Sequence, residues 1–526
     1  MSTRYARLFR TFLPGALAGV ALAWSPGQAL QAQPGPPPAP HAEGDFVTLY
    51  PGRYTPKEAV LVRQYLADNE ALKRRGPIDP TALAAGTLPR DTPGLGPVVH
   101  ATDEWVRYDN RKYDPASRLR NDAAYARSLG FQDIVAYPTF GTNDDVFMTP
   151  YPGAARDKLL VSELNHSVTT YRPVYPGDTL YPVADERTVL DLTPATGATY
   201  RNIVIQTKGS VYNQRGEKVN DVVFRVTENI RVLKPGLAPQ NPGFMEIWIA
   251  PDWMGNRPAH FYTDADWATI RSVWAKEKAR GATPLFWEDV KVGDKPAWTL
   301  DGPIQASVSP IKPWGQGAGG SRTLKAEIMD PATFKTMLRG EKDGIWRMAE
   351  RKDNIPLTPE IKAEAGSPPP PNGEIDTTNI HKEGAQRSIL VNYMGRDLAV
   401  RMIQNWMGDT GWLDTMRWSI MDPRGLRDVG LSVPRDPLAE HWLDEVPGMR
   451  GRYVQTHGMT QDVAITKSEV VGKYVKNGRF LVDLVWWIET IDGKIFEEGK
   501  ATVRLPSRTD KAEQAGPAAA ALPIAS

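Results

Sequence analysis

The sequence predicts an α+β protein in which one structural unit occurs twice. The chain has 526 residues, of which 41% are hydrophobic. A chain of this size can bury a sizeable core, divided among two to four domains at about 150 residues each. Short apolar helices are followed by strands and tight turns in the same order in two regions. The second region closes on Asp492-Gly493, a strong hairpin signal between two alternating segments.

The element pattern supports this class in both regions. Turn residues such as Asn213 and Gly216, and Asp492 with Gly493, separate segments that alternate between apolar and polar side chains. In the first region we expect a helix at 123–131, an apolar segment at 134–140, and strands at 159–171, 200–208 and 222–232. In the second region we expect a helix at 388–406, regular from near Tyr393, and strands at 480–491 and 494–505.

Charge and cysteine content exclude several classes of function. There are 63 Lys and Arg residues against 62 Asp and Glu residues, a net charge of +1. With no basic block, a nucleic-acid partner is not expected. The chain has no cysteine, which excludes disulfides, thiolate nucleophiles and cysteine-ligated metals. No histidines stand at metal-ligand spacing, so we expect no metal and no other cofactor.

The N-terminus is typical of a secretory signal peptide. Arg4, Arg7 and Arg10 precede an apolar stretch at 12–24, and small residues follow it. We therefore expect cleavage after residues 1–32 and a periplasmic or secreted protein. The alternative is an organellar presequence or a start placed too early, and a cytoplasmic protein in the latter case. No later window is apolar enough to span a bilayer.

These signals predict the domain organisation after the signal peptide. The segments are an extension with a helix at 33–99, the first unit at 100–240, a helical linker at 241–284, the second unit at 285–506 with an insert at 312–371, and a disordered tail at 507–526.

Three stretches carry a family resemblance. Residues 172–180 read RPVYPGDTL, residues 122–131 read DAAYARSLGF, and residues 287–294 read WEDVKVGD. With the order of elements, they resemble two MaoC-like hotdog domains in tandem, as in R-specific enoyl-CoA hydratases and acyl dehydratases. The resemblance implies a curved antiparallel sheet wrapped around a central helix in each unit. It also implies that 287–294 is the first strand of the second unit.

The resemblance implies a catalytic pair in the second unit only. Asp376 stands five residues before His381, which is the spacing of the family's catalytic Asp and His. In the first unit the corresponding positions hold Pro115 and Arg120. Arginine stays protonated and proline has no titratable group, so neither can act as a base. One half is then catalytic, and the other serves for shape or for holding the substrate's tail.

This pair suits hydration of a double bond beside a carbonyl. His381 would take or return the proton of a water, and Asp376 would orient that water or supply the second proton transfer. Backbone N–H groups at the start of the helix, near Asn392, Tyr393 and Gly395, would bind the substrate oxygen as it becomes negative. The family usually has His-Gly where this chain has Asn392-Tyr393. The equivalent pair in the first unit is Tyr137-Pro138, and proline has no N–H to donate.

The leading hypothesis is a hydro-lyase that acts at Asp376 and His381 on an enoyl or 3-hydroxyacyl substrate, which we expect to be a thioester. CoA thioesters belong to the cytoplasm, whereas the N-terminus predicts export. An exported protein that binds or acts on a non-CoA small molecule is therefore one alternative, and a thioesterase is another. Both a monomer and a homodimer are open. We interpret His166, His441 and His457 as structural or surface residues.

Overall fold

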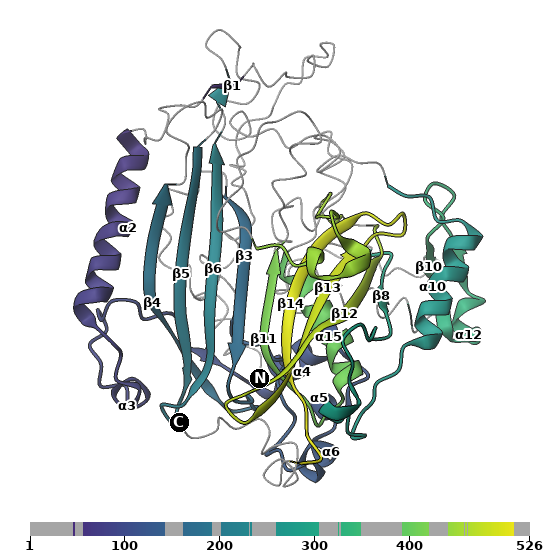
Figure 1. The fold of residues 1–526 in the computed structure, drawn as a ribbon, viewed down its shortest axis with the longest axis horizontal. Coiled ribbons are helices and arrows are strands. Elements are labelled where there is room, and N and C mark those ends of the chain that lie inside the picture. Colours follow the sequence, from purple (N-terminus) through teal and green to yellow (C-terminus); the bar gives the residue numbers. More distant parts are fainter. Residues whose placement is uncertain are drawn as a thin grey trace, which may run out of the picture.

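The computed structural model is α+β and is dominated by one antiparallel sheet of ten strands (Figure 1). It describes residues 46–47, 56–142, 161–191, 201–230, 232–233, 259–304, 325, 328–348, 392–419, 440–456, 458–459 and 461–509. Within these residues no helix is both long and apolar enough to cross a membrane. The predicted signal peptide and the tail beyond residue 509 lie outside the described residues.

The sheet consists of two halves with the same strand order. From its edge to the middle, the first half contains β2 (Val99–His100), β4 (Thr179–Asp191), β5 (Arg201–Asn213), β6 (Lys218–Ile230) and β3 (Val161–Thr170). From the middle outward, the second half contains β11 (Trp412–Ser419), β14 (Ile495–Arg504), β13 (Arg479–Glu489), β12 (Ala464–Lys476) and β8 (Thr299–Asp301). If the five strands of each half are numbered in chain order, both halves read 1-3-4-5-2 from the outer edge of the sheet to its middle. The predicted repeat is confirmed.

The halves join through an antiparallel seam between β3 and β11. His166 lies opposite Trp418 in this pairing, and Thr169 lies opposite Thr415. The Thr170 hydroxyl donates a hydrogen bond to the carbonyl of Leu413 across the seam. The seam makes one continuous sheet of the two halves, so that each half covers an edge strand that would otherwise be exposed.

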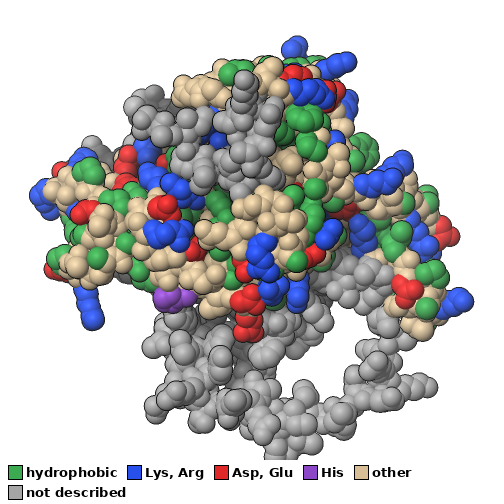
Figure 2. All heavy atoms as spheres, turned by 90° about the horizontal axis from the view of Figure 1, so that it is seen from below, with side chains coloured by type: hydrophobic (Ala, Val, Ile, Leu, Met, Phe, Trp, Pro, Cys, Tyr) green, Lys and Arg blue, Asp and Glu red, His purple; other side chains and the backbone are tan. Residues whose placement is uncertain are grey.

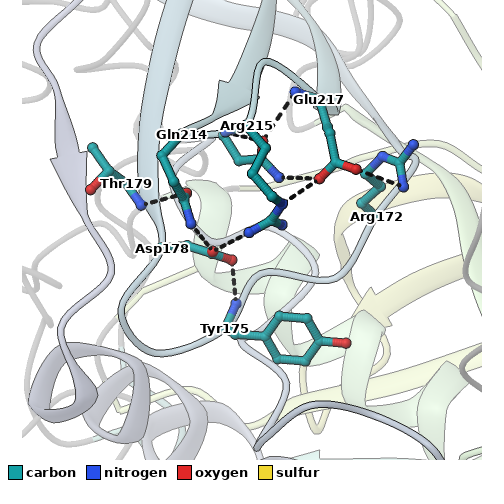
Figure 3. A network of polar contacts seen from close by, with 8 residues as sticks. Arg172, Tyr175, Asp178, Thr179, Gln214, Arg215 and Glu217 are labelled. Carbon is teal, nitrogen blue, oxygen red and sulfur yellow. Dashed lines mark hydrogen bonds and ion pairs between the residues drawn. The ribbon is translucent and has the colours of Figure 1, made fainter. Parts of the chain in front are cut away.

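The RPVYPGD stretch forms a turn that is tied to the β5–β6 hairpin (Figure 3). The carboxylate of Asp178, on the turn, accepts hydrogen bonds from the Tyr175 N–H at 2.9 Å and from Gln214 Nε2 at 2.7 Å. Arg215 joins this carboxylate, at 3.4 Å, to that of Glu217, at 2.7 Å. The motif therefore has a structural basis, because its acidic residue satisfies donors from two loops.

One long helix lies against the second half. Helix α15 (Asn392–Met407) packs on β8 and β11–β14, and buries Leu398, Met402 and Ile403 in the main core. The prediction of a helix that is regular from near Tyr393 is confirmed. The four-residue spacing of its apolar side chains explains the packing, since such positions share one face.

The first half differs in its helices. Between β2 and the described start of β3 it has three short helices, α4 (Asp103–Tyr113), α5 (Arg118–Asn121) and α6 (Ala123–Ser128). The predicted helix at 123–131 is shorter than expected, because Gly130 adopts a left-handed φ of 89° that ends it. Residues 143–160, which follow this region, lie outside the described residues.

Peripheral elements cover the sheet's edges. Helix α2 (Pro56–Arg75) lies along β4 (Figure 1), and its Arg75 donates to the Ala184 carbonyl at 3.1 Å. Beyond β8, a second core contains Trp267 and Trp274 of α10 (Asp264–Lys276). The remaining elements are α3 (Pro80–Ala84), α12 (Pro331–Phe334), η4 (Leu443–Glu445), η5 (Pro447–Met449), β1 (Phe46–Val47), β7 (Val232–Leu233), β9 (Met337–Arg339) and β10 (Trp346–Met348).

The expected first strand at 287–294 is wrong. Trp287–Asp289 forms a 3-10 turn, η3, instead. The Trp287 backbone N–H donates to the Pro506 carbonyl at 2.9 Å, and its indole Nε1 donates to the Leu481 carbonyl at 3.0 Å. The large ring anchors this segment on the end of the sheet, so its backbone is not available to pair as a strand.

Candidate functional site

The predicted site residues fall into two groups. Asp376 and His381 lie outside the described residues. Asn392 and Tyr393 open α15, and Gly395 is in its first turn. The catalytic pair and the binding of the substrate oxygen at this helix start both stay predictions. Its first four N–H groups have no carbonyl partner within the helix.

Gly395 stands against a buried carboxylate that the sequence analysis missed. A Cβ at Gly395 would lie 1.6 Å from Oε2 of Glu497 on β14, so only glycine leaves room for this carboxylate. Glu497 is 2% exposed. The signal was present in the sequence: Glu497 and Glu498 are consecutive in a strand, so one of them must face the inside.

The next two residues of α15 form a buried ion pair. Arg396 Nε lies 2.8 Å from Asp397 Oδ1, and a second guanidinium nitrogen lies 3.0 Å from Oδ2. The guanidinium also lies 4.9 Å from the ring centre of Trp418 on β11. A two-pronged pair of this kind fixes the orientation of both side chains. The first turns of α15 are thus held to the sheet near the seam.

The first half reaches the same helix turns. The Tyr137 hydroxyl donates to the backbone carbonyl of Asp397, and Thr139 Oγ1 donates to Asp397 Oδ1 at 2.8 Å. Tyr137 and Thr139 flank Pro138, so the stretch that was predicted to lack an oxyanion donor lies beside the second half's helix. Its hydroxyl groups position α15 there.

Arg120 occupies the position where the family resemblance places a histidine in the first half. It is 2% exposed. Its guanidinium donates to the Ala136 carbonyl at 2.7 Å and to Oε1 of Gln404 on α15 at 3.0 Å. Burial lowers the pKa of Arg120 below its ordinary value. Its contacts make it a link between the first half and α15.

An aromatic row crosses the seam on the inner face of the sheet. The His166 ring stacks on Trp418 at 5.1 Å between centroids and meets Phe224 edge-on at 4.9 Å. On the other side of Trp418, the indole of Trp486 covers Gly499, where a Cβ would lie 2.2 Å from it. The interpretation of His166 as structural agrees with this burial.

A second ion pair fixes the middle of α15. Arg401 donates to both carboxylate oxygens of Asp301 on β8, at 3.0 and 2.6 Å. Its Nε also lies 3.2 Å from Glu277 Oε1. Burial would lower the pKa of Arg401, but the two carboxylates outweigh burial and raise it. The helix is therefore held at its start by Asp397 and at its middle by Asp301.

Two histidines have carboxylate partners in the described structure. His260 Nε2 lies 3.0 Å from Asp266, and His441 Nδ1 lies 3.4 Å from Glu498. In the described part of the chain, no group of three or more His, Asp or Glu residues is placed to hold a metal. His457 lies outside that part.

A cleft of about 360 Å³ opens at the far end of α15. Its lining includes Asn405 and Trp406 of the helix and three cationic residues, Lys278, Arg280 and Lys295. It lies at the opposite end of the helix from Gly395. On the face seen in Figure 2, positive and negative side chains of the described residues are interspersed, without a patch of one sign.

Comparisons with known proteins found similar solved structures only. No protein-family model matches the sequence, and no curated protein is similar to it. Among solved structures, a MaoC-like dehydratase has a TM-score of 0.41 at 13% identity, covering 78% of this chain and 96% of its own. A MaoC domain dehydratase from Chloroflexus aurantiacus has a TM-score of 0.38 at 14% identity, covering 79% of this chain and 94% of its own.

A third similar structure is described as having two hotdog domains. RV0216 from Mycobacterium tuberculosis has a double hotdog fold and matches with a TM-score of 0.37 at 9% identity, covering 78% of this chain and 94% of its own. The two-half architecture itself rests on the repeated strand order and on the seam between β3 and β11.

Proposed function

We propose that this protein is a hydro-lyase that adds water to an enoyl substrate and removes it from a 3-hydroxyacyl substrate, with a thioester as the simplest carrier. The observation that carries the proposal is the braced start of α15. It follows His381 by eleven positions in the sequence. Its Arg396 lies 4.9 Å from the ring centre of Trp418 on β11, and its Asp397 accepts hydrogen bonds from Tyr137 and Thr139 of the first half.

The proposed chemistry uses these groups in defined roles. As the water oxygen bonds to the β-carbon, His381 takes the water proton and the double-bond electrons move toward the carbonyl oxygen. The free N–H groups at the start of α15 stabilise the negative oxygen. The α-carbon then accepts a proton, with Asp376 as the second proton-transfer group. The reverse sequence eliminates water.

Two substitutions test the catalytic pair. Replacing His381 with Ala or Asp376 with Asn should lower turnover of an enoyl thioester about 10²- to 10⁴-fold each, the usual contribution of a general acid or base. The matched control is His441→Ala, which removes the histidine paired with Glu498 and should leave turnover near that of wild type. Unchanged turnover in the first two variants would remove the assignment. Release of free thiol without hydration would favour a thioesterase.

The carrier group depends on where the protein resides. We propose that the basic and apolar N-terminus, Arg4 to residue 24, directs export. Export favours a substrate that is not a CoA ester, because CoA thioesters are made and used in the cytoplasm. Cell fractionation with N-terminal sequencing tests this. A mature end near Gln33 supports export, whereas cytoplasmic protein that retains Met1 supports the CoA substrate.

A further inference from the structure

Five buried side-chain donors lie on the inner face of the second half without a hydrogen-bond partner. None of them is more than 2% exposed. For each, the described structure offers no acceptor to the side-chain nitrogen or hydroxyl. The donors are Thr299 on β8, Thr466 and Ser468 on β12, Trp486 on β13 and Trp418 on β11.

The strand register makes these donors one patch. Thr299 lies opposite Thr466. Ser468, two residues further along β12 and on the same face, lies opposite Trp486. Gly499 lies opposite both Trp486 and Trp418. Neighbouring strands are about 4.8 Å apart, so the donors on β8, β12 and β13 follow one another closely, and Trp418 lies two strands from Trp486. Helix α15 packs against β8, β12 and β13, which carry four of the five.

Leaving these groups unsatisfied is costly. An unpaired buried donor costs about 1–3 kcal/mol, and native proteins leave only a few such groups in a domain. Valine would fill similar space at Thr466 without that cost. Five such donors on one face of the sheet therefore point to acceptor atoms beyond the described residues, and a bound molecule can supply them.

Charge and surroundings define those acceptors. Glu497 lies on the same inner face and is 2% exposed, so its carboxylate would repel an anionic group. The carboxylate of Asp301 on this face is already paired with Arg401. Leu484 and Ile488, on the strand that carries Trp486, belong to the apolar core. The fitting partner is thus a neutral oxygen on an otherwise apolar carbon skeleton.

We propose that the acyl portion of the substrate carries at least one neutral hydroxyl or carbonyl oxygen beyond the reacting carbons, and that Thr466, Ser468 and Trp486 bind it. This inference rests on the proposed function, because it assigns the substrate class of the same site. It predicts that a plain alkyl chain is bound less well than an oxygenated one, since the alkyl chain leaves the donors unpaired.

Saturated thioesters test the proposal without turnover, because they have no double bond to hydrate. Binding to the full-length protein is measured by calorimetry for hexanoyl-N-acetylcysteamine and for its analogues hydroxylated at the fourth, fifth or sixth carbon. At least one hydroxylated ester should bind about tenfold more tightly than the plain ester. Ser468→Ala, Thr466→Val and Trp486→Phe should each weaken binding of that ester about tenfold and leave the plain ester nearly unchanged.

Thr415→Val is the matched control. Thr415 is on β11, opposite Thr169, which lies on the face of β3 away from His166 and Val168. This variant should bind both esters like wild type. Equal binding of plain and hydroxylated esters, or equal losses for both in the three variants, would overturn the proposal. A crystal structure of the complex with water rather than ester oxygen at these donors would do the same.

Turnover of the unsaturated esters separates this inference from the proposed function. Selective binding of hydroxylated esters without hydration of any unsaturated ester would refute the hydro-lyase activity and support the binding of a substrate oxygen by the patch. Hydration of plain and hydroxylated unsaturated esters, with equal binding of the plain and hydroxylated saturated esters, would refute oxygen binding by the patch and support the hydro-lyase activity.

Discussion

His166 of β3 and Trp418 of β11 stack across the seam between the two halves, with their ring planes 18° apart. They lie directly opposite each other in the strand pairing. The guanidinium of Arg396 lies 4.9 Å from the same indole ring. Trp418 therefore contacts both the seam and the start of α15, so a substitution at the seam should affect the helix.

His166→Leu tests this coupling. The variant keeps an apolar side chain but removes the ring stacking, which is worth about 0.5–1.5 kcal/mol for aromatic pairs. We expect a decrease of about this size in the free energy of unfolding, measured with urea. His100→Leu is the control, because His100 is exposed on β2. An equal decrease in the free energy of unfolding in both variants would show that the stacking of His166 on Trp418 does not stabilise the fold.

Gly395→Ala should disturb the helix start. The added Cβ would meet the Glu497 carboxylate, and overpacking of a buried site typically costs about 1–3 kcal/mol. We expect lower stability by thermal unfolding and lower turnover, because the N–H groups of the first turn would shift. Gly448→Ala is the matched control, since a Cβ there meets nothing within 4 Å. Wild-type stability in Gly395→Ala would contradict the close contact.

Arg401→Met should be among the more damaging substitutions. It leaves Asp301 buried without its two-pronged partner, and breaking such a pair costs about 3–5 kcal/mol. The matched control is Arg508→Met, which removes an exposed two-pronged contact with Asp289 at 2.8 and 2.7 Å. Exposed pairs contribute about 0–1 kcal/mol. Chemical denaturation of both variants gives the comparison, and similar losses would refute it.

Tyr137→Phe combined with Thr139→Val should lower kcat more than it raises KM. Both hydroxyls bind Asp397 from the first half, and each hydrogen bond is worth about 1 kcal/mol. Their loss should loosen the start of α15 without touching the substrate. Tyr474→Phe, which removes a hydroxyl 3.2 Å from Asp483 on the neighbouring strand, is the control. A change confined to KM would instead indicate that these residues contact the substrate.

The hairpin network predicts a pH effect on stability. Burial raises the pKa of Glu217, but hydrogen bonds from Asn213 and Arg215 outweigh burial, so the pKa lies below its ordinary value of 4.5. A carboxylate with a lowered folded pKa stabilises the fold above its unfolded pKa, and this contribution is lost as the pH falls through the folded pKa. Wild type should thus lose more stability than Glu217→Gln on acidification below 4.5. Parallel curves of unfolding free energy against pH would contradict this.

Local patterns predicted the strands and hairpins well because their determinants are local. Asp492-Gly493 and Gly216 set turns, and alternation along residues 480–505 set which side chains face inward. Residues 287–294 misled the sequence analysis, because the anchoring of Trp287 on Leu481 and Pro506 depends on chain almost 200 positions away. The carboxylate of Glu497 beside Gly395 depends likewise on how segments meet.

The amino-acid order alone determined the repeat, the turns and the apolar face of α15, since each follows from side-chain spacing and backbone preference within a few residues. Only the tertiary structure decided where the two halves touch and which side chains make the contacts. Hydrogen bonds from Tyr137 and Thr139 to Asp397, and the stacking of His166 on Trp418, join residues about 250 positions apart. Such contacts depend on the three-dimensional approach of two surfaces, which no local pattern encodes.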